Sequence, residues 1–189
     1  MKLAYKAFQK GWICRGYQFK LGEWNEEGAA NCAKNGFHCA ENPFDCLCHY
    51  PNTKDVVYAV VACDGDLDED AVDSKITCTR MKILKELSLA ELLAEGMRYT
   101  FKYPKRARSA LIRKDLAEGE GKGYAVCAGR DPLISGKEGD LLCYIVEDPK
   151  GRIVGLQMIL VDGECFLADT CYSINDILAK QYEGAAVGT

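Results

Sequence analysis

The sequence predicts an α+β fold, in which a mixed β-sheet with short helices is followed by a small β-rich unit. Three observations support this prediction. In the first half of the chain, short runs that mix aromatic, aliphatic and polar residues are typical of strands. Two segments of that half carry the capping signals that begin helices. In the second half, glycines separate short apolar runs, as they do in small all-β units.

The first elements follow from local patterns. Residues 2–8 and 12–21 are expected as strands because their aromatic and aliphatic residues recur along short runs. Asn42 is a favoured N-cap residue, and Pro43 suits the first helical position because its missing N–H needs no partner there. We therefore predict a short helix that begins at Pro43 and extends through Tyr50.

Residues 55–63 form the clearest predicted strand, because they are apolar on both faces and therefore fit the centre of a sheet. Residues 64–73 are rich in aspartate and are expected as a solvated acidic loop, or as a surface that meets a basic partner. They lack the glycine and the glutamate that a calcium-binding EF-hand loop needs at its sixth and twelfth positions. Strand character resumes over residues 74–84.

Ser88 and Glu91 have the spacing of a capping box, in which each side chain bonds to the backbone N–H of the other residue. This pattern predicts a helix over residues 89–95, and Gly96 lies where a helix commonly stops. Residues 1–98 together are expected to form an α+β N-terminal domain.

Residues 99–115 are expected as a basic connector, because lysines and arginines dominate this segment and a proline interrupts it. Aromatic residues lie among the basic ones, and such a mixture can hold phosphates and stack bases. The connector is therefore a candidate contact for nucleic acid or a nucleotide, and an exposed linker is the alternative. The candidate binding residues are Lys102, Lys105, Arg106 and Arg108.

Residues 116–189 are expected to form a β-rich C-terminal unit with a terminal helix. Asp148-Pro149-Lys150-Gly151 is typical of a turn between two strands, and Asp162-Gly163 is typical of a hairpin. Ser173 or Asn175 is expected to cap the terminal helix.

Charge and composition exclude several classes of function. The 189 residues are 48% hydrophobic and 28% charged, with a net charge of −4, which fits a globular protein and not a general nucleic-acid binder. No apolar run is long enough to cross a membrane, and the N-terminal residues have no signal-peptide pattern. We therefore expect the protein in the cytoplasm. The odd number of cysteines, eleven, argues against a disulfide framework.

Several cysteines lie close in sequence to both histidines of the chain, and thiolates together with imidazoles can bind zinc. Their spacing is unlike that of structural zinc sites, because the chain contains no Cys-x2-Cys pair. We interpret most of them as free cysteines and keep zinc as the alternative. The candidate ligands are Cys32, His38, Cys39, Cys46, Cys48 and His49.

Three motifs recur in a known family: Ala4-Tyr5-Lys6-Ala7-Phe8, Cys14-Arg15-Gly16-Tyr17-Gln18-Phe19 and Gly36-Phe37-His38-Cys39-Ala40-Glu41-Asn42-Pro43. With them the chain resembles an uncharacterised family that is common in bacteriophages and prophages. Its C-terminal part is similar to degenerate β-repeats of adhesin heads. The resemblance implies a phage accessory protein in the host cytoplasm that binds, and thereby inhibits or sequesters, a host factor or a defence component. An oligomeric phage structural part is the alternative that the β-repeats imply.

The order of elements also resembles the ADP-ribosyltransferase scaffold, with a Tyr-Lys strand, a Gly-Phe-His turn before a helix, and then an apolar strand. This resemblance implies an enzyme or a nucleotide-binding protein, with NAD as ligand. We expect binding rather than catalysis, because no Glu-x-Glu or Gln-x-Glu pair lies at the start of a strand. The candidate catalytic residues are Lys6, His38 and Glu86. The candidate residues of the cleft are Tyr5, Lys6, Phe37, His38 and Tyr50.

Overall fold

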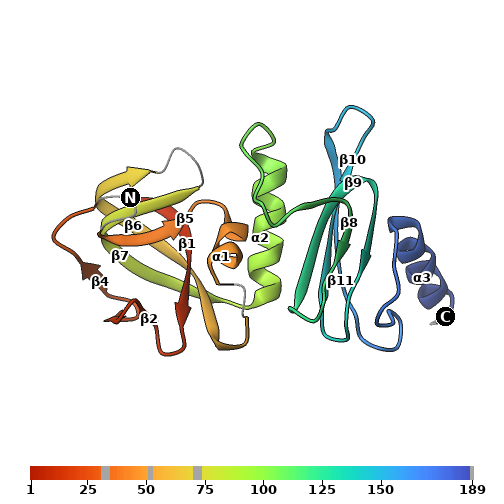
Figure 1. Cartoon of the computed structure of the whole chain (residues 1–189), viewed down its shortest axis with the longest axis horizontal. Helices are drawn as coiled ribbons and strands as arrows, with labels where there is room; N and C mark the ends of the chain where they lie inside the picture. Colours follow the sequence, from red (N-terminus) through yellow and green to blue (C-terminus); the bar gives the residue numbers. More distant parts are fainter. Residues whose placement is uncertain (31–34, 51–52, 70–73, 188–189) are drawn as a thin grey trace. The chain divides into compact units, whose positions relative to one another are not determined.

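The computed structural model describes residues 1–30, 35–50, 53–69 and 74–187, and two β-sheets dominate it (Figure 1). Strands contain 48% of the residues and helices contain 19%. The prediction of an α+β fold is therefore wrong, and the protein is β-rich. The balance shifts because residues predicted as an acidic loop and as a basic connector also form strands.

The chain divides into two compact units, an N-terminal unit of residues Met1–Leu111 and a C-terminal unit of residues Ile112–Thr189. The division falls within residues 99–115. At one end of that segment the backbone is helical through Lys102, and at the other end a strand begins at Arg113. The residues between them form turns and irregular backbone.

Seven strands of the N-terminal unit form one sheet: β1 (Lys2–Gln9), β2 (Ile13–Cys14), β3 (Tyr17–Gln18), β4 (Trp24–Glu26), β5 (Phe37–Ala40), β6 (Val56–Glu69) and β7 (Lys75–Leu87). Four of these strands close into a ring. β1 pairs with β6 along its whole length, and β7 pairs with both β5 and β6. Tyr5 of β1 faces Ala40 of β5 and so closes the ring.

The ring encloses a hydrophobic core. Successive side chains of a strand point to opposite faces, so Ala4 and Phe8 of β1 point inward together, and both are fully buried. The ring of Phe19 lies against those of Phe8 and Phe37, at centroid distances of 5.1 and 4.9 Å. Such aromatic pairs stabilise a core beyond the area that they bury.

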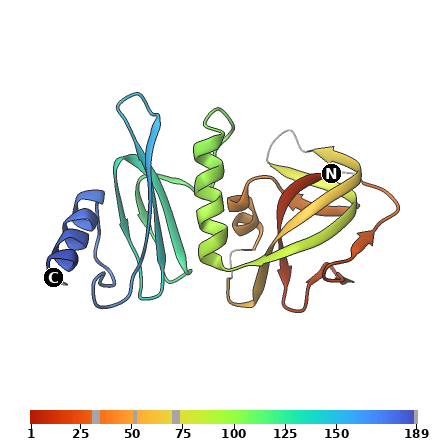
Figure 2. The same ribbon diagram turned by 180° about the vertical axis from the view of Figure 1, so that it is seen from behind.

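The first helix, α1 (Pro43–His49), confirms the prediction made from Asn42 and Pro43. The Asn42 side chain accepts a hydrogen bond from the backbone N–H of Phe44 (3.1 Å), and Pro43 begins the helix. The Phe44 side chain is fully buried. It lies between α1 and the second helix, and the two helices are side by side in both views (Figures 1 and 2).

The second helix, α2 (Leu89–Lys102), begins as predicted with the capping box of Ser88 and Glu91. The prediction that it stops at Gly96 is wrong, because Gly96 lies inside the helix. The ring of Phe44 packs directly on Gly96, so that a Cβ atom there would lie 2.5 Å from a ring carbon. Glycine is present in this helix to allow close packing and not to end the helix.

The acidic residues after Val61 continue a strand. β6 extends to Glu69 and pairs antiparallel with β7, with Leu67 facing Cys78, and its register shifts between Asp64 and Leu67. The prediction of a loop is therefore wrong for residues 64–69, and residues 70–73 lie outside the described residues. The pattern of apolar residues did not predict this part of β6, because most of residues 64–69 are exposed and their acidic side chains are solvated.

The C-terminal unit contains four strands: β8 (Arg113–Glu118), β9 (Tyr124–Ser135), β10 (Leu141–Glu147) and β11 (Ile153–Leu160). They form one sheet with strand order β11-β10-β9-β8, accompanied by α3 (Ile174–Val187) (Figure 2). β8 pairs parallel with β9, and β9 pairs parallel with β10. The predicted turn from Asp148 to Gly151 joins β10 and β11, which are antiparallel. Ser173 caps α3, whereas residues 165–167, one of the apolar runs, form no strand.

The glycines before β9 surround a buried carboxylate. Asp140 is 1% exposed and accepts hydrogen bonds from the backbone N–H groups of Gly121, Gly123 and Lys137, at 3.0, 2.7 and 2.9 Å. The Cα of Gly119 also lies close to this carboxylate, so that a Cβ atom there would collide with it. The closely spaced glycines therefore let the backbone wrap around a side chain of the same unit.

Candidate functional site

A cavity of about 320 Å³ opens in the N-terminal unit where β1 and β5 separate. Tyr5 faces Ala40 across the two strands, and Lys6 and Cys39, which would form the next pair, line the cavity instead. We call this cavity the β1–β5 pocket. Its charged, aromatic and thiol side chains are Tyr5, Lys6, Arg15, His38, Cys39, Asp45, Cys46, His49, Tyr50 and Lys75.

Lys6 is a buried lysine in the wall of this pocket, with an exposed fraction of 5%. Its ammonium donates a hydrogen bond to the backbone carbonyl of His38 (2.6 Å) and lies over the rings of Phe8 and Phe19, 5.3 and 5.5 Å from their centroids. Within the described parts of the chain, no carboxylate forms an ion pair with it. An ammonium has three N–H donors, and the bond to His38 leaves two of them without a hydrogen-bond acceptor among the described residues.

Positive charge converges on this pocket. Burial lowers the pKa of His38, and the charges of Lys6, Arg15 and Lys75 lower it further. The imidazole of His38 is therefore neutral at pH 7, in a field set by three cations. Asp45 is the one carboxylate among the described residues that line the pocket, so the wall carries a net positive charge.

Two tyrosines add aromatic surface to the β1–β5 pocket. The Tyr5 hydroxyl donates to Glu95 Oε2 (3.3 Å), and the Tyr50 hydroxyl contacts the Cys14 sulfur (3.5 Å). Burial raises the pKa of each tyrosine to about 12, so both stay protonated at neutral pH. Their rings can stack on a flat ligand.

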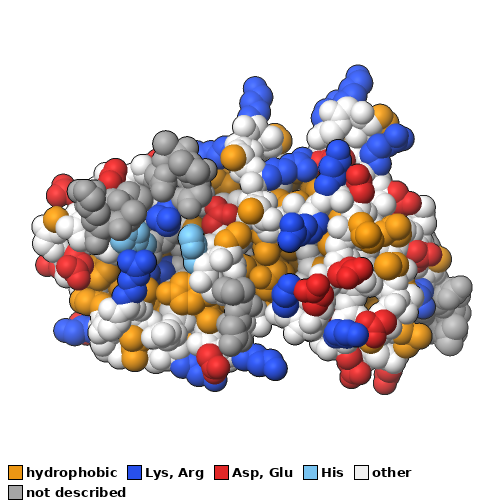
Figure 3. All heavy atoms as spheres, viewed as in Figure 1, with side chains coloured by type: hydrophobic (Ala, Val, Ile, Leu, Met, Phe, Trp, Pro, Cys, Tyr) orange, Lys and Arg blue, Asp and Glu red, His pale blue; other side chains and the backbone are white. Residues whose placement is uncertain are grey.

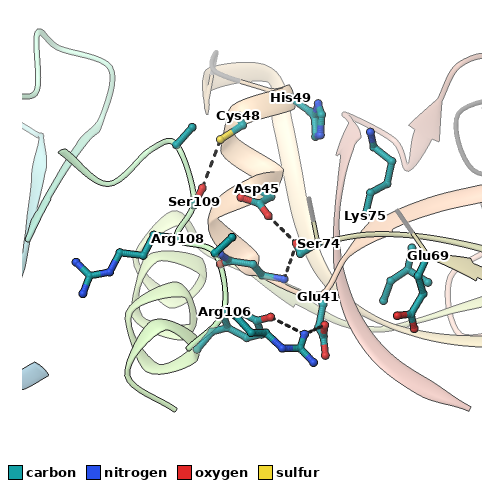
Figure 4. Close-up of a pocket in the computed structure, with 15 residues that line it drawn as sticks. Glu41, Asp45, Cys48, His49, Glu69, Ser74, Lys75, Arg106, Arg108 and Ser109 are labelled. Atoms are coloured by element: carbon teal, nitrogen blue, oxygen red, sulfur yellow. Dashed lines mark hydrogen bonds and ion pairs between the residues drawn. The ribbon is translucent and has the colours of Figure 1, made fainter. Parts of the chain in front are cut away.

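A second cavity of about 500 Å³ adjoins the first and shares Asp45, His49 and Lys75 with it. We call it the α1 cavity. Figure 4 shows that α1, the beginning of β7 and the segment after α2 supply its wall. Ser74 donates a hydrogen bond to Asp45 (2.6 Å), which fixes the carboxylate shared by both cavities.

The far wall of the α1 cavity is held by side-chain pairs. Arg106 forms an ion pair with Glu41 and a hydrogen bond with the Tyr99 hydroxyl (2.9 Å). The Cys48 sulfur and the Ser109 hydroxyl oxygen are 3.6 Å apart. Figure 4 shows these pairs bridging the segment after α2 to α1 and to the residue that follows β5. Their side chains already have partners, which makes this wall a structural support.

The structure places the residues predicted for a cleft as follows. Tyr5, Lys6, His38 and Tyr50 line the β1–β5 pocket together. Phe37 is 4% exposed and belongs to the core. Among the candidate catalytic residues, Lys6 and His38 meet, whereas Glu86 is exposed on β7 and does not line the pocket.

The four basic residues predicted to bind are exposed and differ in their surroundings. Lys102 and Arg106 lie over the ring of Tyr103, 5.4 and 5.1 Å from its centroid. Arg106 and Arg108 line the α1 cavity, whereas Lys105 lines neither cavity. Figure 3 shows histidine side chains of the N-terminal unit at the surface, beside Lys and Arg side chains.

The candidate zinc ligands are spread over different environments. Cys32 lies outside the described residues, Cys39 and Cys46 are buried, and Cys48 and His49 are exposed on α1. His38 lies in the β1–β5 pocket with Cys39 and Cys46. In the described segments, no three His, Cys, Asp or Glu side chains are arranged to hold a metal ion.

Sequence reasoning missed Arg15, Asp45 and Lys75 as residues of the pocket. Arg15 lies in the turn between β2 and β3, with a left-handed backbone (φ 50°), and this turn places its side chain at the pocket. It is part of the motif Cys14-Arg15-Gly16, which was the available signal. Lys75 reaches the pocket through the pairing of β7 with β5, which is a contact between residues distant in sequence.

The fold and the pocket thus define a β-rich protein whose N-terminal unit contains a positively charged cavity. Residues 2–95, which supply all of that cavity, match the family model described as "Domain of unknown function (DUF7666)". A search of the curated proteins and a search of the solved structures found no significant match. None of the helices in the described residues is long and apolar enough to span a membrane.

Proposed function

We propose that the N-terminal unit binds a small molecule carrying a phosphate group, such as a mononucleotide, in the β1–β5 pocket. The observation that carries this proposal is the buried ammonium of Lys6, which has one hydrogen bond and no ion-pair partner among the described residues. The volume of the pocket, about 320 Å³, lies at the lower end of the range of small-molecule sites, so a small ligand fits best.

Burial of an ammonium costs several kcal/mol unless a counter-charge or several hydrogen bonds offset it. One carbonyl and two aromatic faces offset part of that cost at Lys6. A phosphate oxygen about 4 Å away would add an attraction of about 4 kcal/mol at an effective dielectric constant near 20. A phosphate group is therefore the chemistry that the wall of the pocket lacks.

The neighbouring side chains fit the same ligand. Arg15 is exposed at the edge of the pocket, where a guanidinium can form paired hydrogen bonds with a phosphate. The rings of Tyr5 and Tyr50 offer surfaces on which a base can stack. Binding is favoured over catalysis, because Glu86 is not in the pocket and Asp45 is held by Ser74.

Calorimetry on the full chain tests the proposal, with inorganic phosphate, adenosine monophosphate and adenosine as probes. We expect the monophosphate to bind more tightly than adenosine. Lys6→Met should weaken the binding of the monophosphate at least tenfold, since it removes about 1.4 kcal/mol or more. Lys82→Met is the matched control, because Lys82 lies on β7 and lines neither cavity.

Nuclear magnetic resonance gives a second readout that does not depend on a variant. The chain has two histidines, and both line the β1–β5 pocket. A bound phosphate should raise the pKa of His38, because an anion offsets the cations that lower it. Unchanged histidine titration curves with saturating phosphate and monophosphate, together with equal affinities of Lys6→Met and the parent protein, would contradict the proposal.

The inhibition of a host factor or a defence component by a phage accessory protein stays a prediction, and so do an ADP-ribosyltransferase-like activity and a structural oligomer. A pull-down from host lysate tests the first, since one stoichiometric partner is expected. NAD hydrolysis lost in variants of Lys6, His38 or Glu86 tests the second. Light scattering tests the third, for which a trimer is expected.

A further inference from the structure

Three cysteine side chains meet inside the ring of strands. Cys39 comes from β5, Cys63 from β6 and Cys78 from β7, and their exposed fractions are 6%, 0% and 0%. The sulfur atoms of Cys39 and Cys63 are 3.1 Å apart. The Cys78 thiol donates a hydrogen bond to the backbone carbonyl of Phe37 (3.6 Å) in the same core, and we call the three side chains the cysteine cluster.

The cluster spans the ring rather than one pair of neighbouring strands. β5 and β6 each pair with β1 and with β7, and in the described residues they do not pair with each other. Their thiols therefore approach across the interior. A disulfide bond is about 2.05 Å long, so the sulfurs of Cys39 and Cys63 need to move by only about 1 Å to bond.

The cluster has a route to small molecules. Cys39 lines the β1–β5 pocket, and Cys63 and Cys78 lie behind it in the core. The pKa of the Cys78 thiol is lowered, whereas the pKa values of Cys39 and Cys63 are raised, that of Cys39 first by its hydrogen bond with Cys63.

We propose that Cys39 and Cys63 are a redox pair, which hydrogen peroxide converts into an intramolecular disulfide across the ring of strands. The thiolate of one cysteine attacks a peroxide oxygen, the O–O bond breaks, and hydroxide leaves, so that a sulfenic acid forms. The second thiol displaces that hydroxyl and forms the S–S bond. The protons of the two thiols complete two water molecules, and peroxide takes the two electrons.

This inference does not depend on the ligand of the β1–β5 pocket. The pocket gives peroxide access to Cys39, and the ring of strands holds the sulfurs of Cys39 and Cys63 3.1 Å apart. The disulfide would tie β5, which carries His38, to β6. A dithiol reductant would reverse it by thiol–disulfide exchange.

Peptide mapping of the full chain tests the redox pair. The exposed thiols of Cys48, Cys165 and Cys171 are first alkylated in the folded protein, so that they cannot form other links. Peroxide is then added under native conditions, and the protein is digested and analysed by mass spectrometry. We expect one linked peptide pair that contains Cys39 and Cys63, with the mass of two hydrogens lost, and its disappearance after treatment with a dithiol.

Two variants sharpen the test. Cys63→Ala should abolish the link, whereas Cys143→Ala, which removes a buried thiol of the C-terminal unit, should leave it unchanged. The parent protein decides the matter even if Cys63→Ala does not fold. Absence of the linked peptide in the native parent protein, or its appearance only in denaturant, would overturn the proposal.

Discussion

Gly96 lies in the middle of α2, and its replacement by alanine sets two known effects against each other. Alanine is the better helix former by about 1 kcal/mol, so propensity alone predicts that Gly96→Ala stabilises the protein. The structure predicts the opposite. A Cβ atom at residue 96 would lie 2.5, 2.6 and 2.7 Å from three ring carbons of Phe44.

The clash cannot be relieved cheaply, because the Phe44 side chain is fully buried. Overpacking of this kind costs about 1–3 kcal/mol, and contacts with three ring carbons at once place it at the upper end of that range. After the gain in helix propensity is subtracted, we expect Gly96→Ala to lower the free energy of unfolding by about 1–2 kcal/mol.

Tryptophan fluorescence during urea unfolding measures this loss in the right unit, because both tryptophans, Trp12 and Trp24, belong to the N-terminal unit. Gly28→Ala is the matched control, since a Cβ atom at residue 28 meets nothing within 4 Å and the residue has no left-handed backbone. Gly96→Ala with a midpoint equal to or above that of the parent protein would refute the reasoning.

Two further predictions concern titration and a buried carboxylate. The pKa of His38 is lowered in the folded state, so near its ordinary pKa of 6.5 the unfolded chain binds more protons than the folded protein does. The free energy of unfolding should therefore fall as the pH drops through that value. The variant His38→Gln should lose less stability than the parent protein between pH 7.5 and about 5.5, as measured by tryptophan fluorescence. Asp140→Ala should destabilise the C-terminal unit by about 3 kcal/mol, because three backbone N–H groups lose a charged acceptor. Hydrogen exchange should then speed up at Gly121 and Gly123, and unchanged exchange would contradict this prediction.

Local signals predicted the elements that local chemistry determines. Asn42 and Pro43 located the beginning of α1, and Ser88 and Glu91 located that of α2, because a cap needs only residues within one turn. The apolar run after Asp55 located the buried half of β6 for a similar reason, since it is apolar on both faces.

The predictions from the sequence were wrong where contacts between residues distant in the chain determine the secondary structure. Gly96 continues a helix because Phe44 packs on it, and no pattern within α2 reveals that contact. The acidic end of β6 is a strand because β7 pairs with it. β8 pairs parallel with β9, and parallel pairing has no turn signal between neighbouring strands.

The candidate site was predictable in part. The resemblance placed Tyr5, Lys6, His38 and Tyr50 at one cleft, and the same four residues line the β1–β5 pocket. The charge of the pocket was not predictable, because it depends on how β7 and the turn before β3 approach β1. The burial of Lys6 was equally hidden, since lysine is almost always exposed.

The closed ring of strands also affects how the chain folds while it is being synthesised. Lys2 of β1 pairs with Cys63 of β6, so about sixty further residues must leave the ribosome before the first strand finds its main partner. At about 5–20 residues per second, that wait lasts about 3–12 s. During it most of β1 lacks a strand partner, because β2 and β5 each pair with it at one residue only, and other chains can recruit its exposed edge. Chaperone binding during translation should therefore concentrate on nascent chains that end before β6.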